Sequence, residues 1–349
     1  MNDKVRKNIR RIPLFILAIA AAVIIAALIR YAIIYKKGHD FVEDKMVGNS
    51  NINVMLSRPD DWHIIQTGSI SLDKDDFAWI DGSTATIPIT AELARQFCGA
   101  SDDDISDYVD HNTTHYAYEY LIYSKTRYEI YGNFNVYKDK KLIFVTEPSQ
   151  DELDLAKQEH VEFDVTPIAM DGFVFITHKD NPVDSLTVEQ IQDIYSGKIT
   201  NWKEVSGNDE KIIPYQRERN SGSQTAMEQI VMKGVPLMEP AESYYEVEGM
   251  GMLIEMIAEY ENRENSIGYT YYYYLNNLYK SDDIKVLKIN GISPDNENLA
   301  DYKYPFTTAY YAVMKKDQEG LPRELRDYLL TDEGQEIIKL AGYCPVNGG

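Results

Sequence analysis

The stretch RERNSGSQT at residues 217–225 decides how this chain is interpreted. Arg217 stands four residues ahead of a Ser-Gly-Ser run, and an apolar i, i+3, i+4 pattern follows as far as Gly234, which predicts a helix that begins near Ser221. The first turn of a helix offers unpaired N–H groups and partial positive charge, so it attracts anions. Hydroxyls of Ser221 and Ser223 and a two-pronged guanidinium would add to that attraction. The alternative is a helix cap behind a solvated arginine.

The N-terminus carries a second strong feature. Residues 12–29 are 18 consecutive uncharged positions, and the apolar run continues beyond Arg30 to Lys36, which is long enough to span a bilayer. Five basic residues precede it and favour a cytoplasmic N-terminus. We expect residues 1–37 to form a basic tip and one transmembrane anchor, followed by a polar linker at residues 38–70. A cleaved signal peptide is the alternative, although the small residues lie inside the apolar run.

The charge of the chain is unevenly distributed. The formal net charge is −21, and residues 1–37 contribute +7, so the remainder carries −28. Such an acidic exterior argues against nucleic acid as a partner and against docking on anionic lipid. An anionic ligand would have to be held by local hydrogen bonds, against the overall field.

Few residues suggest a cross-link or a metal site. Cys98 and Cys344 could pair in an exported protein or remain small buried side chains, and the sequence leaves both possibilities open. His111 and His115 have the i, i+4 spacing of two metal ligands on a helix, but no third ligand is visible nearby. We expect no metal, no cofactor and no catalytic residue.

The rest of the chain reads as a mixed α/β domain of roughly 280 residues, a size suited to two lobes. Residues 142–146 and 172–177 have the pattern of strands, and a helix is expected around 152–158. Thr187 and Gln190 form a capping box that predicts the start of another short helix. This alternation of strands and helices indicates largely parallel sheets.

A run of tyrosines, YTYYYY at residues 269–274, invites comparison with an aromatic platform for carbohydrate. We favour a strand that leads into a helix, because Ile267 and Gly268 precede the run. The rings would then lie half in the core with their hydroxyls at the surface.

Several sequence blocks occur in a fixed order between about Ile80 and Val346. They are DGFVFI at 171–176, NPVDSLT at 181–187, IYSGKITNW at 194–202, the Arg-x-x-x-Ser-Gly-Ser loop at 217–223, SIGY at 266–269, EGQ at 333–335 and GYCPV at 342–346. Together they resemble the phosphate-binding proteins that serve ABC-type phosphate importers, in which threonine usually stands at the position of Ser223. The resemblance implies an α/β, two-lobed periplasmic-binding-protein-like fold (type II), preceded by one N-terminal transmembrane helix.

The resemblance also implies where the lobes and the ligand lie. Within a domain at residues 71–349, lobe 1 would comprise about 71–172 and 305–349, lobe 2 about 173–304, and the ligand would occupy the cleft between them. Carried over segment by segment, it implies the ligand-binding residues Ser83, Thr84, Thr86, Thr113, Thr114, Glu147, Arg217, Ser221, Gly222 and Ser223.

Glu147 would bear on the identity of the ligand. The family has an aspartate or an arginine in this segment. A carboxylate repels a fully ionised oxyanion but accepts a hydrogen bond from a protonated one, so an inward-facing Glu147 would favour phosphate over sulfate. A second departure from the family is Thr307-Thr308-Ala309, where an arginine is usual.

The resemblance implies a membrane-anchored, extracytoplasmic solute-binding protein. It would capture inorganic phosphate and deliver it to the permease subunits of an ABC importer, without enzyme activity. One alternative is a membrane-anchored sensor or scaffold of the same fold with a degenerate or different oxyanion site. A phosphoesterase is the other, although no nucleophile–base pair or metal cluster is evident.

Overall fold

The computed structural model describes residues 61–65, 68, 70–123, 139–240, 246–247, 250–259, 263–278 and 281–346. All of them belong to one compact unit of the chain. The predicted anchor at residues 12–29 and most of the linker at 38–70 lie outside the described residues. Among the residues that are described, no helix is both long and apolar enough to cross a membrane.

A sheet of eight strands runs through the described part of the chain. Its hydrogen-bonded order is β1-β2-β11-β3-β8-β5, and β9 and β12 also pair with β3. These strands are β1 (Ile80–Gly82), β2 (Leu142–Val145), β3 (Phe163–His178), β5 (Ile213–Pro214), β8 (Ser266–Tyr271), β9 (Ile284–Val286), β11 (Thr307–Lys315) and β12 (Cys344–Pro345). Two smaller pairs are β4 (Ser185–Leu186) with β10 (Lys288–Ile289), and β6 (Gln216–Arg217) with β7 (Glu246–Val247).

Helices pack against this sheet. The α-helices are α2 (Ile87–Cys98), α3 (Thr114–Tyr123), α4 (Gln150–Gln158), α5 (Val188–Tyr195), α6 (Gly222–Ala226), α7 (Met250–Glu259), α8 (Asn296–Ala300), α9 (Leu321–Leu329) and α10 (Asp332–Leu340). Segments of π-helix occur at Met227–Met232 and Tyr274–Leu278, and 3₁₀ turns at Lys74–Trp79, Thr84–Thr86, Ile105–Asp107, Trp202–Val205 and Arg263–Asn265.

The sheet is mixed, so the prediction of largely parallel sheets is wrong. β1 pairs with β2 and β5 with β8 in parallel. However, β11 is antiparallel to both β2 and β3, and β3 is antiparallel to β8 and β9. The short connection through α4 makes β2 and β3 parallel to each other. The strand β11 follows only after a long α/β excursion, and it inserts between β2 and β3 in the opposite direction.

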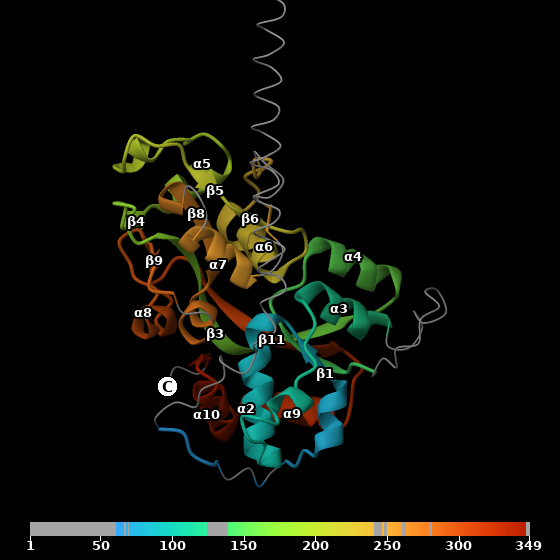
Figure 1. Ribbon diagram of the computed structural model, residues 1–349. Helices are drawn as coiled ribbons and strands as arrows, with labels where there is room; N and C mark the ends of the chain where they lie inside the picture. The colour runs from blue at the N-terminus through green and yellow to red at the C-terminus, as the bar shows by residue number, and fades with distance from the viewer. Residues whose placement is uncertain are drawn as a thin grey trace, which may run out of the picture. The chain divides into compact units, whose positions relative to one another are not determined.

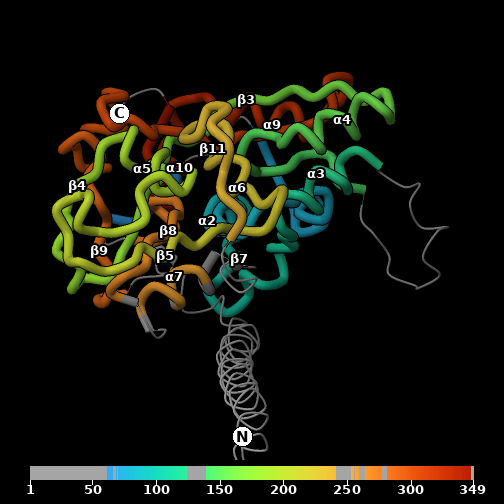
Figure 2. Tube along the Cα trace, turned by 90° about the horizontal axis from the view of Figure 1, so that it is seen from above, coloured from blue at the N-terminus to red at the C-terminus, as the bar shows by residue number. Residues whose placement is uncertain are grey.

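The long strand β3 takes part in two halves of the sheet. Its residues 163–172 pair with β11, and its residues 173–178 pair with β8 and β9. The strand predicted at 172–177 is therefore the second half of a longer element. Figure 1 shows β3 and β11 between a group of helices that includes α2, α9 and α10 and a second group that includes α5, α6 and α7. The view in Figure 2 shows β3 and β11 side by side.

Two of the α-helices begin at capping boxes, and the box at Thr187 confirms the prediction made from the sequence. In α5 the Thr187 hydroxyl accepts from the N–H of Gln190 at 3.1 Å, and the Gln190 side chain accepts from the N–H of Thr187 at 2.9 Å. The same reciprocal bonds join Ser149 and Glu152 at the start of α4. Each box satisfies two N–H groups that a helix start leaves unpaired.

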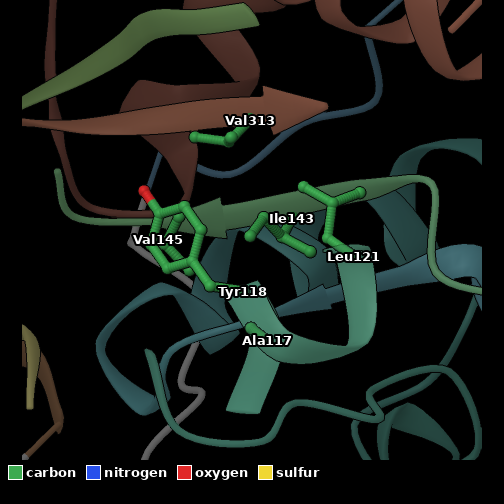
Figure 3. Close-up of a cluster of buried hydrophobic side chains, with 6 residues drawn as sticks. All are labelled: Ala117, Tyr118, Leu121, Ile143, Val145 and Val313. Carbon is green, nitrogen blue, oxygen red and sulfur yellow. The ribbon is translucent and has the colours of Figure 1, made fainter. Parts of the chain in front are cut away.

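Six buried side chains fill the space between α3, β2 and β11 (Figure 3). They are Ala117, Tyr118, Leu121, Ile143, Val145 and Val313. The Tyr118 hydroxyl also donates to the carbonyl oxygen of Thr146 at 2.7 Å. The core therefore fixes the first residue after β2.

The tyrosine run leads from a strand into a helical turn, as expected. β8 ends at Tyr271, and the π-helical segment begins at Tyr274. The rings are buried more deeply than predicted, because Tyr269 packs against Phe173 and Phe175 of β3, and Tyr271 packs against Phe173. The run is part of the core and not an exposed aromatic platform.

Candidate functional site

Five segments that are far apart in the sequence line one small cavity with a volume of about 80 Å³. The lining residues are Ser83, Thr84, Ala85, Thr113, Thr114, Thr146, Arg217, Glu218, Ser221, Gly222, Ser223 and Tyr271. Eight of the ten predicted ligand residues are among them. The wall is rich in hydroxyl groups, and the space suits a few waters or one small ion.

Arg217 ends β6 and is almost completely buried at the cavity wall. Its Nη1 donates to the Ser223 hydroxyl at 3.0 Å. Its Nε and Nη2 donate to the two carboxylate oxygens of Glu218 at 3.1 and 2.8 Å. The backbone N–H of Arg217 donates to the Tyr269 hydroxyl at 2.9 Å, which ties the loop to β8. These contacts fix a positive charge in one place.

The helix after this loop starts at the predicted position. Ser221 is the N-cap of α6, and its hydroxyl accepts from the N–H of Gln224 at 3.2 Å. After Ala226 the segment continues to Met232 as a π-helix and not as the predicted α-helix. It ends just before Gly234, whose φ of +91° is a left-handed conformation that favours glycine.

Gly222 has no space for a side chain. A Cβ atom there would lie 2.6 Å from the Thr146 hydroxyl oxygen and 2.7 Å from that of Thr114, closer than such atoms approach in real structures. Hydroxyls from two separate segments thus converge on the start of α6. The Thr146 hydroxyl is buried and close to the Tyr271 hydroxyl, and Thr146 lines the cavity.

Ser83 and Thr84 lie between β1 and α2. The N–H of Ser83 donates to the carbonyl oxygen of Phe144 at 2.9 Å, which holds this loop to β2. Thr86, also predicted as a ligand residue, does not line the cavity. Its buried hydroxyl faces the carbonyl oxygens of Phe144 at 2.6 Å and Ser83 at 3.0 Å, so it stabilises the loop.

The second segment, at Thr113 and Thr114, is held by a buried carboxylate. Asp81 accepts from the backbone N–H of Asn112 at 2.8 Å and from its side-chain amide at 2.7 Å. Burial raises the pKa of Asp81, whereas the Lys140 charge and the bonds from Asn112 oppose that rise. The contacts link the loop after β1 to the start of α3.

Glu147 does not line the cavity, which corrects its expected inward orientation. Its side chain is exposed and accepts a hydrogen bond from the Tyr311 hydroxyl at 2.9 Å. Successive residues of an extended segment point to opposite sides, and Thr146 takes the inward side here. The carboxylate that does line the cavity belongs to Glu218.

Four lining residues are not among the predicted ligand-binding residues: Ala85, Thr146, Glu218 and Tyr271. Thr146 and Glu218 each adjoin a predicted residue, so the sequence locates the loop without locating the residue that faces the ligand. Tyr271 donates to the carbonyl oxygen of Gly222 at 3.0 Å. Its only signal is the tyrosine run, which is equally typical of core packing.

His111 and His115 do not share a helix face, because α3 begins at Thr114. The Nδ1 atom of His115 lies 3.0 Å from Oε1 of Glu152, and this hydrogen bond raises the pKa of His115. In the described part of the chain, no group of three or more His, Cys, Asp or Glu side chains is arranged to hold a metal. Cys98 and Cys344 are both free thiols.

A further contact joins α4 to the loop that follows β6. Asp151, in the first turn of α4, accepts from Arg219 Nη2 at 2.8 Å and from the Asn220 amide at 3.0 Å. Asn220 has a φ of +64°, a conformation that asparagine tolerates better than most residues. This bridge connects the helix after β2 to the loop after β6.

Comparisons with known proteins agree with this architecture. A family model described as a PBP superfamily domain matches residues 141–333. The phosphate-binding protein PstS of Bacillus subtilis is 30% identical over 180 residues, which cover 51% of this chain and 56% of that protein. PstS of Borreliella burgdorferi is 24% identical over 278 residues, or 78% of this chain and 91% of that protein. The match to the Bacillus protein thus spans little more than half of its length.

A solved structure gives the same result. The phosphate ABC transporter substrate-binding protein of Clostridium perfringens, determined with bound phosphate, has 27% sequence identity and a TM-score of 0.58, and the match covers 76% of this chain and 98% of that one. An ABC-type phosphate transport receptor from Vibrio cholerae shares the fold at 20% identity, with a TM-score of 0.53. These similarities confirm the predicted resemblance and the two-lobed α/β fold.

Proposed function

The chain belongs to the PBP superfamily, and from that premise we propose that it is a solute-binding protein that captures inorganic phosphate for an ABC importer. The observation that carries the proposal is the convergence of eight predicted residues on one cavity of about 80 Å³. Taken separately, each of these hydroxyl residues lies near a helix start or a strand end and would be an ordinary cap. Their meeting at a buried arginine supports an oxyanion site.

The chemistry of the wall suits a partly protonated oxyanion. Arg217 supplies the charge, and hydroxyls of Ser83, Thr114 and Thr146 supply donors. Glu218 supplies an acceptor, because an ionised carboxylate can only accept hydrogen bonds. Phosphate at neutral pH brings a P–OH proton that a carboxylate can accept, whereas sulfate brings none and would be repelled.

The division into lobes is part of the proposal. Lobe 1 comprises about residues 71–172 and 305–349, and lobe 2 about 173–304. The change of partners along β3, from β11 to β8 after residue 172, supports this division. The contacts of Asp151 with Arg219 and Asn220 would hold the lobes closed and help to seal the ligand from water.

Anchoring and delivery complete the proposal. The apolar segment at residues 12–29 would hold the binding domain at the outer surface of the membrane, near the permease subunits. The relatives named PstS and the Clostridium structure support a transporter partner. The acidic remainder of the chain supports a partner that is not nucleic acid.

Calorimetry of the full chain in detergent tests the proposal. We expect phosphate to bind at one site per chain, with sulfate and a larger oxyanion binding far more weakly. Absence of heat with phosphate, in a preparation that unfolds cooperatively, would reject phosphate capture and leave the fold assignment intact.

One observation favours a second candidate, a sensor or scaffold with a degenerate site. The guanidinium of Arg217 is already paired with the Glu218 carboxylate, so part of its positive charge is neutralised before any anion binds. In that case added phosphate would not raise the unfolding temperature. A phosphoesterase ranks lower, because no histidine or cysteine is found among the described residues that line the cavity, and a turnover assay on a phosphomonoester would detect one.

A further inference from the structure

Two loops of the cavity hold each other in place. Asn112, in the loop before α3, donates twice to Asp81, the middle residue of β1. In the opposite direction, His111 reaches back to the loop after β1, where its Nδ1 lies 2.9 Å from the carbonyl oxygen of Ser83. Ser83 and Thr113 both line the cavity, so this reciprocal contact joins two walls of the site.

The geometry around His111 determines where its proton lies. A carbonyl oxygen can only accept a hydrogen bond, so the Nδ1 that faces Ser83 must carry the proton. Nε2 lies 2.8 Å from the hydroxyl oxygen of Thr90 on α2. In a neutral ring Nε2 is then an acceptor, and the Thr90 hydroxyl donates to it.

The surroundings keep the ring neutral. Burial lowers the pKa of His111 to about 4, with a further decrease from Lys140, while the bond to Ser83 and the nearby Asp110 oppose it only in part. The ring is also closely packed, because a Cβ on Gly82 would lie 2.7 Å from its Cε1 atom. The hydrogen-bonding pattern of His111 is therefore constant across the physiological pH range.

The Ser83 carbonyl oxygen faces His111 Nδ1 at 2.9 Å and also accepts from the N–H and the hydroxyl of Thr86, each at 3.0 Å, and these contacts together fix a peptide plane. The carbonyl of Ser83 and the N–H of Thr84 belong to one planar trans peptide and point in opposite directions. With the carbonyl turned to His111, the N–H of Thr84 points away from the ring. Thr84 lines the cavity, and a backbone N–H directed into it would suit an oxyanion.

We propose that His111 is a positioning residue of the oxyanion site: its Nδ1–H holds the Ser83 carbonyl so that Ser83 and Thr84 present their donors to the ligand. His111 itself is absent from the cavity wall. The inference rests on the proposed function, because it is read out as affinity for phosphate. It assigns a role in binding to a partly buried histidine, for which the sequence offered only the i, i+4 spacing with His115.

Two amide variants distinguish the ends of the imidazole. His111→Asn can place an amide N–H near the position of Nδ1, whereas His111→Gln places its amide near Nε2 and abandons Ser83. His115→Gln is a matched control, because His115 is three-tenths exposed and pairs with Glu152, away from the cavity wall. The measurements are calorimetric titration of the full chain with inorganic phosphate and, separately, thermal unfolding without ligand.

We expect His111→Gln to weaken phosphate binding by roughly tenfold or more, as for loss of one buried hydrogen bond, and His111→Asn to stay within about threefold of wild type. His115→Gln should match wild type. ¹⁵N spectra should show a protonated Nδ1 and an unprotonated Nε2 on His111 at pH 7. A doubly protonated or Nε2-protonated ring would overturn the proposal.

The outcomes separate this inference from the function on which it rests. If His111→Gln lowers the unfolding temperature but binds phosphate as tightly as wild type, His111 is merely structural and the inference is wrong. If His111→Gln binds better than His111→Asn, the Thr90 end matters and the inference is equally wrong. A wild type that binds no phosphate overturns the proposed function and this inference together.

Discussion

Arg217 and Glu218, neighbours in the sequence, form a two-pronged ion pair on the wall of the cavity, with Nε and Nη2 at 3.1 and 2.8 Å from the two carboxylate oxygens. The pair presents a fixed positive charge and an acceptor-only group to the same small volume. A ligand that satisfies both must carry negative charge and a proton. Under the proposed function, this requirement would favour phosphate over sulfate.

Removal of Arg217 should abolish most of the affinity. Arg217→Ala deletes a buried charge-assisted partner, and the expected loss of phosphate binding free energy is about 2–5 kcal/mol. Glu218 would then face the anion without a counterion, which adds to the loss, so the double variant with Glu218→Gln should recover part of it. Lys203→Ala is the control, because Lys203 is exposed, pairs with Asp209 at the surface and is outside the cavity wall. Equal affinities for Arg217→Ala and wild type, by calorimetry, would remove Arg217 from the site.

Selectivity should depend on Glu218 and not on Glu147. In Glu218→Gln an amide can donate to an unprotonated oxygen, so rejection of sulfate should relax by roughly ten- to a hundredfold while phosphate weakens modestly. Glu147→Gln should leave both affinities unchanged, because Glu147 is exposed and bonded to Tyr311. Titration of each variant with both anions decides the matter. A change confined to Glu147→Gln would restore the interpretation made from the sequence.

Asp171 should make stability depend on pH. Its side chain is fully buried on β3, and burial raises its pKa to about 7, although the N–H groups of Tyr273 and Gly172 donate to Oδ1 at 3.1 and 2.6 Å. Its other ionisable neighbours, Tyr310 and Tyr343 among them, have raised pKa values and stay neutral near pH 7.

The sign follows from proton linkage. Because the folded chain holds the Asp171 proton more tightly than the unfolded chain, this group stabilises the fold at low pH and loses its contribution as the pH rises through 7. Asp171→Asn keeps an oxygen acceptor and cannot ionise. Between pH 5 and 8 the stability of wild type should therefore fall by about 3 kcal/mol relative to Asp171→Asn. Denaturant titration at both pH values measures this, and parallel pH profiles would show that Asp171 does not titrate in this range.

The topology at the N-terminus can be tested on intact cells. External protease should release a soluble fragment that begins within residues 38–70, because the linker would be exposed and the anchor at 12–29 protected. N-terminal sequencing identifies the cut. A mature N-terminus already inside residues 18–27, before protease is added, would mean that the segment is cleaved as a signal peptide.

The sequence predicts elements whose signals are local. The α5 helix follows from the Thr187–Gln190 capping box, and the start of α6 follows from Ser221 ahead of an apolar pattern. Both signals lie within four residues, so no tertiary information is needed. The resemblance adds the order of the site segments, which the single cavity supports.

Such local signals do not determine which of two adjacent side chains faces inward. Thr146 and Glu147 are adjacent, and whichever faces inward depends on how β2 packs against α3, which Tyr118 fixes through the Thr146 carbonyl. The direction of β11 and the bond from His111 to Ser83 likewise depend on residues brought together from distant parts of the chain. Long-range packing decides these details.

The shared strand β3 has a mechanical consequence. The backbone of β3 continues without a break from its pairing with β11 into its pairing with β8. If β3 leaves one half of the sheet, the hydrogen bonds of the other half are therefore disturbed as well. A protein built in this way should melt as one cooperative block, with a single calorimetric peak whose van't Hoff and calorimetric enthalpies agree. Cutting the chain between the halves would then yield two fragments that do not fold alone. The two halves are expected to behave as one folding unit and not as two domains joined by a flexible linker.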